Sequence, residues 1–239
     1  MKITVVCEHN AAMDSAEGKA AYPEGMSKCI ADFLAADGNE VTQVRIDEKG
    51  ASALTDEILQ NTDVMFWWAH IYHGAVEDEI AEKVVDRVHR GMGLVCLHSA
   101  HKSKVFMRVT GAPGTLKWRE DGEHERLWCV DMTHPIARGL GEYIDIPREE
   151  MYGEPFGIPA PDELVYVGWF RGGEVFRGGC VFKRGSGKLF YFNPGHETYP
   201  TYKIPEVQKL LVQAARYVAP VLPVAETLDC PNVPVPSVK

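Results

Sequence analysis

Short apolar runs alternate with amphipathic stretches over the first hundred residues of the chain. Four runs have the length and near-continuous apolar character of strands buried on both faces: 3–7, 41–46, 63–68 and 93–97. Three helical patterns separate them, at about 24–36, 54–61 and 76–90. Parallel strands need a crossover connection, so this order predicts an α/β fold with a parallel sheet and helices on both faces.

The second half of the chain has the pattern of strands joined by tight turns. The expected strands are 126–130, 164–170, 174–183 and 188–192. The glycine pairs at 172–173 and within 184–187 are typical of hairpin connections between such strands. These strands either extend the first sheet at one edge or form a small excursion from it. A closing amphipathic helix is expected over 203–218.

The 239 residues fit one large domain or two small ones, and no linker divides them. We therefore expect a single domain over 1–219, followed by a Pro-rich tail over 220–239. An extended tail of this kind lies on the body or on a neighbouring subunit, so a homo-oligomer is one expectation.

Charge and composition exclude several classes of protein. The net charge of −9 and the lack of a basic stripe argue against nucleic acid as a partner. No apolar run is long enough to cross a bilayer, and the N-terminal run meets charge too soon for a signal peptide, so we expect no membrane partner and a cytoplasmic protein. No glycine-rich phosphate loop follows a strand, which argues against a nucleotide cofactor. The six cysteines form no CxxC pair and are expected to be reduced.

Histidines follow the predicted ends of four strands. They are His9 after the first strand, His70 and His73 after the third, His98 and His101 after the fourth, and His196 after the last. The carboxyl ends of parallel strands meet at one edge of a sheet, so we expect these side chains to converge there. Imidazoles near carboxylates are typical ligands of a divalent ion, with zinc or manganese favoured here.

We assign the metal-ligand role to four of these histidines and a substrate-binding role to the other two. The predicted metal ligands are His70, His98, His101 and His196, and the predicted substrate-binding histidines are His9 and His73. The spacings are not the HExxH signature, so the prediction depends on the fold bringing these residues together.

Two glutamates are candidates for acid–base catalysis. Glu154 lies among apolar neighbours, where burial is expected to raise its pKa. Glu197 directly follows His196 and either moves a proton or orients a histidine. By contrast, Glu123 and Glu125 lie in a charged run and are expected to be solvated.

Ser99 offers a competing chemistry. It lies in the turn after the fourth strand, where a nucleophile elbow would be, near several histidines. The turn lacks the flanking glycines of the GxSxG motif. A serine hydrolase with a histidine base is therefore an alternative to a metal enzyme.

Aromatic side chains in the predicted loops are candidates for contact with a sugar ring. Trp118, Tyr152 and Tyr199 lie outside the expected strands, and we predict that they bind substrate. Their flat apolar faces suit the apolar faces of sugars.

Several of these segments together resemble the trehalose-utilisation (ThuA-like) family, within the class I glutamine amidotransferase-like superfamily. The matching segments are Tyr22–Met26, Trp67–His73, Gly91–Ser99, Leu116–Glu120, Glu149–Glu154 and Asn193–Tyr202. The resemblance covers about residues 2–219. It implies a flavodoxin-like three-layer α/β sandwich, with a mostly parallel sheet and a late antiparallel extension, and a role in sugar catabolism. Amidotransferases of the superfamily carry a Cys at the elbow, whereas this chain has His98 and Ser99, so glutamine amidotransferase activity is not expected.

These observations together predict a metal-dependent enzyme of trehalose, disaccharide or keto-sugar utilisation. The bound ion would polarise a carbonyl or a hydroxyl pair, and the enzyme would isomerise or cleave next to the carbonyl. Two alternatives stay open: the serine hydrolase described above, and a non-catalytic module that binds sugar or regulates its use.

Overall fold

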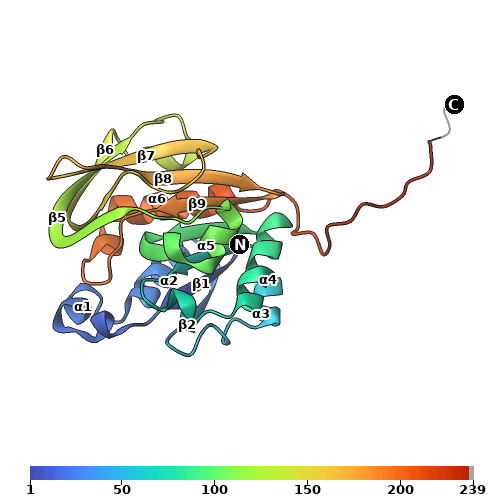
Figure 1. The fold of residues 1–239 in the computed structure, drawn as a ribbon, viewed down its shortest axis with the longest axis horizontal. Coiled ribbons are helices and arrows are strands. Elements are labelled where there is room, and N and C mark those ends of the chain that lie inside the picture. The colour runs from blue at the N-terminus through green and yellow to red at the C-terminus, as the bar shows by residue number, and fades with distance from the viewer. Residues whose placement is uncertain (237–239) are drawn as a thin grey trace.

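One nine-stranded sheet runs through the molecule (Figure 1). The structure is a computed structural model that describes residues 1–236. The strands lie in the order β2-β1-β3-β4-β9-β8-β7-β5-β6. Their bounds are Lys2–Glu8 (β1), Glu40–Ile46 (β2), Val64–Trp68 (β3), Gly93–Leu97 (β4), Lys117–Cys129 (β5), Tyr143–Gly153 (β6), Glu163–Phe170 (β7), Val175–Arg184 (β8) and Gly187–Phe192 (β9).

The sheet is mixed, which corrects the expectation of a mostly parallel sheet. Strands β2, β1, β3, β4 and β9 pair in parallel, and β9, β8, β7, β5 and β6 pair antiparallel. The late strands therefore extend the first sheet at its edge. The prediction underestimated this half because β5 begins at Lys117 in a highly charged stretch, and because β6 was interpreted as a loop.

Helices cover both faces of the parallel half. The α-helices are Ala16–Ala21 (α1), Met26–Ala36 (α2), Asp56–Gln60 (α3), Asp78–His89 (α4), Lys104–Thr110 (α5) and Pro205–Val218 (α6). Short 3-10 helices are Ala11–Asp14 (η1), Tyr72–Gly74 (η2), His98–Lys102 (η3), Pro135–Ala137 (η4) and Thr201–Lys203 (η5). The helix α5, which the sequence analysis did not predict, is capped by Ser103, whose hydroxyl accepts the backbone N–H of Phe106.

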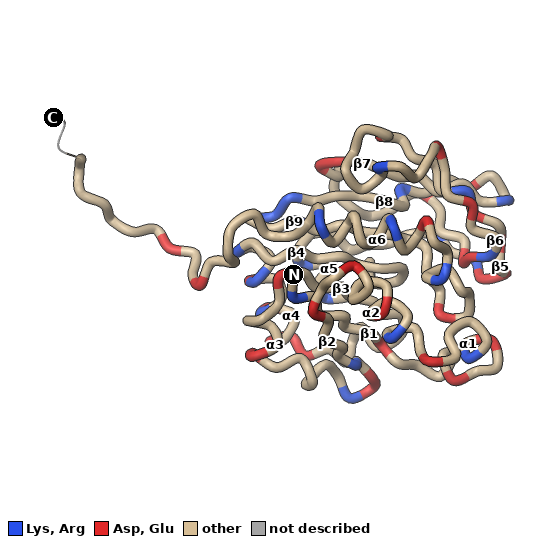
Figure 2. The backbone as a smooth tube through the Cα atoms, turned by 180° about the vertical axis from the view of Figure 1, so that it is seen from behind, with Lys and Arg blue, Asp and Glu red and all other residues tan. Residues whose placement is uncertain are grey.

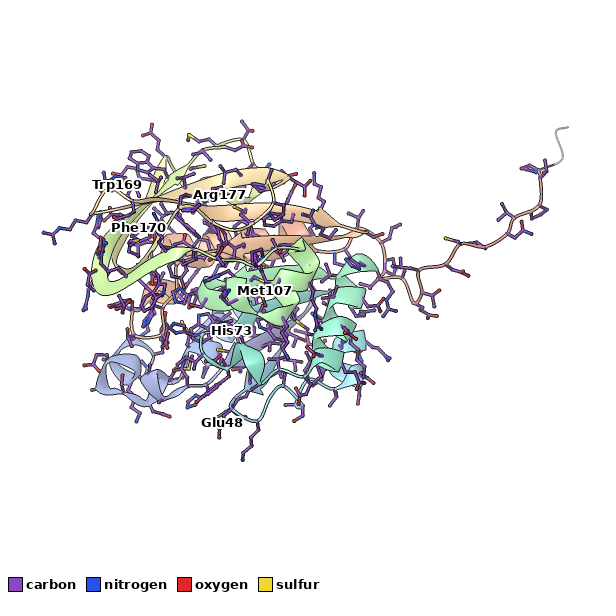
Figure 3. All side chains as sticks on the ribbon, in the orientation of Figure 1. Glu48, His73, Met107, Trp169, Phe170 and Arg177 are labelled. Atoms are coloured by element: carbon purple, nitrogen blue, oxygen red, sulfur yellow. The ribbon has the colours of Figure 1, made fainter. Side chains whose placement is uncertain are left out.

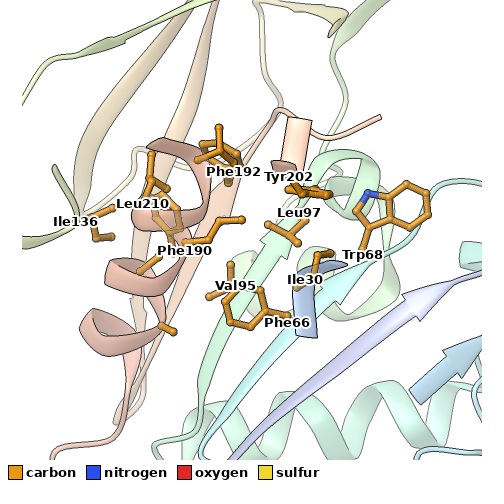
Figure 4. Close-up of a cluster of buried hydrophobic side chains, with 14 of the residues drawn as sticks. Ile30, Phe66, Trp68, Val95, Leu97, Ile136, Phe190, Phe192, Tyr202 and Leu210 are labelled. Carbon is orange, nitrogen blue, oxygen red and sulfur yellow. The ribbon is translucent and has the colours of Figure 1, made fainter. Parts of the chain in front are cut away.

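Alternate residues of the strands supply two separate cores, which gives the molecule three layers. Val5 of β1 faces one core with α2 and α6, and its neighbour Val6 faces the other core with α4 and α5. Figure 4 shows the first core, where Phe66, Val95 and Phe190 from adjacent strands pack against Leu210 of α6. This alternation arises because successive side chains of a strand point to opposite faces.

After α6 the chain leaves the body as an extended tail (Figure 1). Ala225 exchanges backbone and side-chain hydrogen bonds with Arg90, and the described residues beyond it are exposed. The last three residues of the predicted tail, 237–239, lie outside the described part of the chain. Within residues 1–236, no helix combines the length and the apolar character needed to span a bilayer.

A candidate active site of histidines and carboxylates

Three histidines meet at the carboxyl edge of the parallel half. His70, His98 and His196 come after β3, β4 and β9, which are neighbours in the sheet. Their ring centroids lie 5.2–5.5 Å apart in all three pairs. The loops after neighbouring parallel strands begin at the same edge of the sheet, so the fold brings together residues that are far apart in the sequence.

His98 is fully buried, and neighbouring residues contact both faces of its ring and its Nδ1 atom. Its backbone has φ 52°, the left-handed conformation that a side chain other than glycine rarely adopts. Its ring is stacked between Trp68 and Tyr152, at centroid distances of 6.3 Å and 5.2 Å. Its Nδ1 lies 3.0 Å from the carbonyl oxygen of Asn193, so Nδ1 donates and Nε2 is left for other partners.

The partner of His98 Nε2 is Glu150 of β6, at 3.1 Å. Burial alone would lower the pKa of His98, but the hydrogen bond with Glu150 and the charges of Glu149 and Glu197 raise it to about 9. Burial would raise the pKa of Glu150, but its contact with His98 outweighs burial and holds the pKa below its usual value. The pair is therefore an imidazolium–carboxylate pair when no other cation is present.

His70 forms the second histidine–carboxylate pair. Its Nδ1 lies 2.9 Å from both carboxylate oxygens of Glu197. Asn10 also donates to Glu197, at 3.0 Å. Burial would raise the pKa of Glu197, but the His70 hydrogen bond outweighs it and the pKa falls to about 2. Glu197 is thus ionised, and the side chain of His70 is 23% exposed, which places it at the entrance of the site.

His196 is buried beside His70 and His98. Burial and the nearby His98 lower its pKa to about 4. Its Nδ1 lies 2.9 Å from the hydroxyl of Thr198, and its Nε2 lies 3.6 Å from Glu197. Its Nε2 is also 4.0 Å from Glu120 of β5, which accepts a hydrogen bond from Tyr199. His196 is therefore a neutral imidazole with carboxylates on its Nε2 side.

Two further buried carboxylates hold the loops that carry these histidines. Glu8, at the end of β1, accepts the backbone N–H groups of His70, Ile71 and Tyr72 at 2.8–3.0 Å. Glu149 of β6 accepts those of Gly195 and His196, at 2.7 Å and 3.0 Å, and the hydroxyl of Thr201. Removing either carboxylate would leave several buried donors without a partner.

Two sets of three side chains have ligand atoms close enough together to share a metal ion. One set is His70, Glu150 and His196, and the other is His70, His98 and Glu197. Within each set the ligand atoms lie within 4.8 Å of one another. Imidazole nitrogens and carboxylate oxygens in this number suit zinc or manganese.

His101, predicted as a metal ligand, does not join these sets. Its Nδ1 donates to the carbonyl of Gly114 at 2.6 Å, and its ring packs edge-on against Tyr152. Burial lowers its pKa to about 3. The sequence placed His101 correctly after β4, but the helical turn η3 directs it to the loop before β5.

In a nucleophile elbow, the nucleophile is the residue with the strained backbone conformation. Here that residue is His98, with φ 52°, so Ser99 is not at the elbow position. The Oγ of Ser99 lies 2.6 Å from the hydroxyl of Tyr152, which in turn lies 3.4 Å from His98 Nε2. Burial holds the pKa of Tyr152 well above its usual value, so Tyr152 is no base for Ser99. Within the described residues, Ser99 has no hydrogen bond to a histidine.

Glu154 forms an ion pair that the sequence did not indicate. It lies just after β6 and is bound by Arg177 of β8, with Nε–Oε1 at 2.8 Å and Nη2–Oε2 at 3.0 Å. Arg177 is labelled on the antiparallel half in Figure 3. Burial would raise the pKa of Glu154, but the bonds from Arg177 and the Phe156 backbone lower it, so the expected raised pKa is wrong.

The predicted substrate-binding residues are divided between different places. Tyr152 stacks on His98, and Tyr199 lies 5.4 Å from the His196 ring. Trp118 lies on β5, where its side chain is 65% exposed, and Tyr152 lies on β6. Both therefore lie in strands and not in the expected loops. His9 pairs with Asp14 of η1.

His73, the remaining predicted substrate-binding residue, lies in η2, three positions after His70 in the sequence, and is labelled in Figure 3. Burial lowers its pKa to about 4, and its buried Nδ1 has no hydrogen-bond partner among the described residues. It is therefore a neutral imidazole in the loop that carries His70.

Three buried glutamates form the acidic part of the site, and the sequence did not identify them. Glu8, Glu149 and Glu150 are at most 4% exposed, yet none was predicted as a site residue. Glu8 ends the first apolar run, a position that could have identified it. Glu125 was expected to be solvated but is fully buried beside Asn193, and burial holds its pKa well above the usual value.

Comparisons with known proteins agree with this architecture. No curated protein matches the sequence. A putative ThuA-like protein from Parabacteroides merdae is similar in structure, with 16% identity, a TM-score of 0.68, and 95% of this chain and 93% of that chain covered. A cytoplasmic protein from Salmonella typhimurium is also similar in structure, with 14% identity and a TM-score of 0.64. The match covers 92% of this chain and 100% of that chain.

A β-galactosidase from Rahnella contains a similar domain, with 14% identity and a TM-score of 0.56, over 93% of this chain and 32% of that chain. At these identities the likeness shows the fold alone. The sequence model of the trehalose-utilisation family covers residues 15–218, which include His70, His98 and His196 and both of their carboxylate partners. This chain therefore belongs to the ThuA family, described as trehalose utilisation.

Proposed function

We propose that this protein is a metal-dependent enzyme that acts on a sugar or keto-sugar at the histidine–carboxylate site. The observation that carries the proposal is the meeting of His70, His98 and His196 with Glu150 and Glu197 at one sheet edge. Family membership supports a role in sugar utilisation. A cytoplasmic location, the absence of a nucleic-acid or membrane partner, and a homo-oligomer belong to the same proposal.

Hydrogen bonding around the histidines favours the metal. The carbonyl of Asn193 fixes His98 with Nε2 toward Glu150, and Glu197 fixes the ring of His70 in the same way. Histidines that bind metal ions typically donate their other ring N–H to a carbonyl or a carboxylate, which sets the tautomer and the ring orientation. A divalent ion here would polarise a sugar carbonyl or hydroxyl pair.

The chain's own groups supply the proton transfers. The ionised Glu197 lies 3.6 Å from Nε2 of the neutral His196, and Glu120 lies 4.0 Å from the same nitrogen. Burial raises the pKa of Glu120 above its usual value, so this carboxyl group holds its proton to a higher pH than an ordinary glutamate does. A proton on a carbon next to a carbonyl can thus be taken by one group and returned by another, as isomerisation or epimerisation requires.

A second candidate uses the same site without a metal ion. The close contact of His98 and Glu150 makes His98 an imidazolium, which is itself an acid that can stabilise a developing oxyanion. The serine hydrolase has less support, because the Oγ of Ser99 bonds to Tyr152 and not to a histidine base. The non-catalytic sugar-binding module stays the alternative if no turnover is found.

Metal content measured on untagged protein tests the proposal. We expect near-stoichiometric zinc or manganese in the wild type and a loss of at least about tenfold in His98→Ala and His70→Ala. His124→Ala is the matched control, because His124 lies on β5 and pairs with Asp145 outside the site. Wild type that binds no ion after incubation with zinc and manganese would contradict the metal and leave the acid–base candidate.

Hydrogen exchange in D2O tests the chemistry separately. The protein is incubated with fructose and with a keto-disaccharide, and deuterium at the carbon beside the carbonyl is followed by NMR. Wild type should catalyse the exchange and His196→Ala should not. If neither ketone exchanges or is consumed, the isomerase proposal is wrong and the binding-module alternative gains support.

A further inference from the structure

Three aromatic side chains lie on one exposed face of the antiparallel half. Trp128 of β5 lies opposite Tyr143 of β6, and Arg126 of β5 lies opposite Trp169 of β7. Val175 of β8 lies opposite Trp169. Residues directly opposite each other, or two apart on one strand, share a face of the sheet. We call these five residues the aromatic face; its three aromatic side chains and Val175 are 38–48% exposed.

The side chains of the aromatic face contact one another. The rings of Trp128 and Tyr143 have centroids 4.9 Å apart and planes tilted by 56°. The guanidinium carbon of Arg126 lies 4.6 Å from the Tyr143 centroid and 5.8 Å from the Trp128 centroid, within the range of cation–π contacts. Trp, Tyr and Arg are the residues that most often carry the binding energy of protein interfaces. The aromatic face therefore has the composition of a binding surface.

The C-terminal tail contains a segment that suits such a surface. Pro231 and Pro234 have the spacing of a PxxP motif, and Pro236 follows them. In a polyproline II helix, which has about three residues per turn, Pro231 and Pro234 lie on the same side. Val233 and Val235 between the prolines are exposed as well. Proline-rich segments in this conformation dock in aromatic-lined grooves of binding domains, so the tail offers the apolar groups that the aromatic face can cover.

The charges of the tail and of the aromatic face are complementary. Glu226 and Asp229 are the charged residues of the described tail, and Figure 2 shows acidic but no basic positions along it. Among the described residues, Arg126 has Asp145 as its only ion-pair partner, at 3.5 Å. A guanidinium has several N–H donors and can take a second carboxylate. Asp229 precedes Pro231 by two residues, so it can reach Arg126 when Pro231 lies against the rings.

The tail of one chain is too short to cover its own aromatic face. Arg90 hydrogen-bonds the backbone of Ala225 and Glu226, which fixes the start of the free segment. From Glu226 to Pro234 an extended polyproline segment spans about 25 Å. A folded body of this size is about 40 Å across. Figure 3 shows Trp169 at the end of the body opposite the tail, so the aromatic face within reach belongs to another molecule.

We propose that the proline-rich tail binds the aromatic face of a second copy of this chain, so that two chains exchange tails in a homodimer. Reciprocal exchange uses the same contact twice, as a two-fold dimer does. Once one tail is bound, the second contact forms at a high effective concentration, which strengthens a contact that is weak by itself. The inference gives the homo-oligomer a specific interface and does not depend on the chemistry at the histidines.

Sedimentation equilibrium of the full chain measures the association. We expect wild type to form dimers at micromolar concentration. A tail variant with both Pro231→Ser and Pro234→Ser, and a face variant with Trp169→Ser, should each raise the dissociation constant of the dimer at least about tenfold. The tail variant leaves the packing of the body intact, because both prolines are exposed. Trp118→Ser is the matched control, since Trp118 is an exposed tryptophan of β5 outside the aromatic face, and it should behave as wild type.

Cys230 allows the position of the tail to be measured directly. It is exposed next to Pro231, so a benzophenone maleimide can be attached to it. Irradiation should then crosslink Cys230 to peptides that contain Trp128, Tyr143 or Trp169. In an equilibrated mixture of unlabelled and nitrogen-isotope-labelled protein, the crosslinked peptides should pair the two isotopes, as contact between two chains requires. Cys230→Ser is the control that identifies crosslinks from any other cysteine.

Three outcomes overturn the inference. A monomeric wild type would leave the aromatic face to a different protein. A dimer whose dissociation constant is the same in wild type, the tail variant and the face variant would use another interface. Crosslinks confined to one isotope would place the tail on its own body. The metal and exchange experiments judge the proposed function separately, because neither the tail nor the aromatic face supplies a residue to the two ligand sets.

Discussion

The parallel and antiparallel halves of the sheet contribute different chemistry to one site. The parallel half, β1 to β4 with β9, presents histidines at its strand ends. The antiparallel half presents carboxylates from within strands, with Glu149 and Glu150 on β6 and Glu120 on β5. His98 on the first half and Glu150 on the second meet at 3.1 Å. One ligand set, His70, His98 and Glu197, comes from the parallel half, and the other set also needs Glu150 of the antiparallel half.

The difference arises from how the two kinds of strand expose their residues. A parallel strand buried on both faces is apolar along its length, so polar residues gather where it ends. An antiparallel strand can keep polar residues along its length, because one face often meets solvent or a polar site. Glutamates on β6 therefore resemble a solvated run in the sequence, although they are buried in the structure.

The variant with the largest expected effect tests whether the antiparallel half is needed for catalysis. Glu150→Gln keeps the shape of the side chain but removes the charge that faces His98. We expect the rate of ketone exchange to fall by ~10²–10⁴-fold, as for loss of an acid–base or charge-stabilising group. Glu123→Gln is the control, because Glu123 on β5 pairs with Arg119. An active Glu150→Gln variant would confine the chemistry to the parallel half.

The next effect tests whether the two halves unfold as one unit. Leu94 of β4 and Leu127 of β5 are both fully buried, one in each half. Replacing either with Ala should lower the free energy of unfolding by about 2–5 kcal/mol in a single transition, because each leaves a cavity. Trp128→Ala, at a 38% exposed position, should have a smaller effect. Urea unfolding followed by circular dichroism measures all three.

Two transitions in Leu127→Ala, with the second at the wild-type midpoint, would show that the antiparallel half unfolds separately. The single continuous sheet predicts the opposite result.

A smaller effect, on the pH dependence of stability, is expected from His101, which follows β4 and bonds to Gly114 in the loop before β5. Burial lowers the pKa of His101 to about 3, below 6.5 in the unfolded chain, so the unfolded state binds a proton first as the pH falls. Stability from this group is complete above pH 6.5 and is lost as the pH falls toward 3. The slope is up to ~1.4 kcal/mol per pH unit.

His101→Gln keeps a donor for the Gly114 carbonyl but does not titrate. The free energy of unfolding, measured with urea at pH 7, 6 and 5, should therefore depend less on pH in the variant. Toward pH 5, the number of protons bound on unfolding should be lower by about one than in wild type. Equal slopes in the two proteins would mean that His101 titrates normally when folded.

The smallest effect is expected at Glu154. Its carboxylate is held by Arg177 and contacts no histidine of the site, so Glu154→Gln should change the exchange rate by less than about twofold. The loss of a partly exposed ion pair should reduce stability by about 1 kcal/mol or less. A large loss of activity with intact folding would restore the acid–base role that the sequence suggested.

The sequence predicted the parallel half well because its periodicity is local. Strands β1, β3 and β4 lie within one residue of their predicted bounds, and the convergence of His70, His98 and His196 results from them. His101 does not join the other three histidines, because the helical turn η3 after β4 directs its side chain elsewhere. The expected raised pKa of Glu154 was wrong because Arg177, 23 residues away, could not be paired with it from pattern alone.

The sequence by itself determined the α/β class, the family and the edge of the sheet where the histidines gather, since each depends on short-range pattern or on strand order. Tertiary structure alone decided that β6 lies beside the site, that Glu150 faces His98, and that Glu8 and Glu149 anchor the histidine loops. Those contacts join residues 46 to 64 positions apart, and the burial of a carboxylate depends on the partners that the fold supplies.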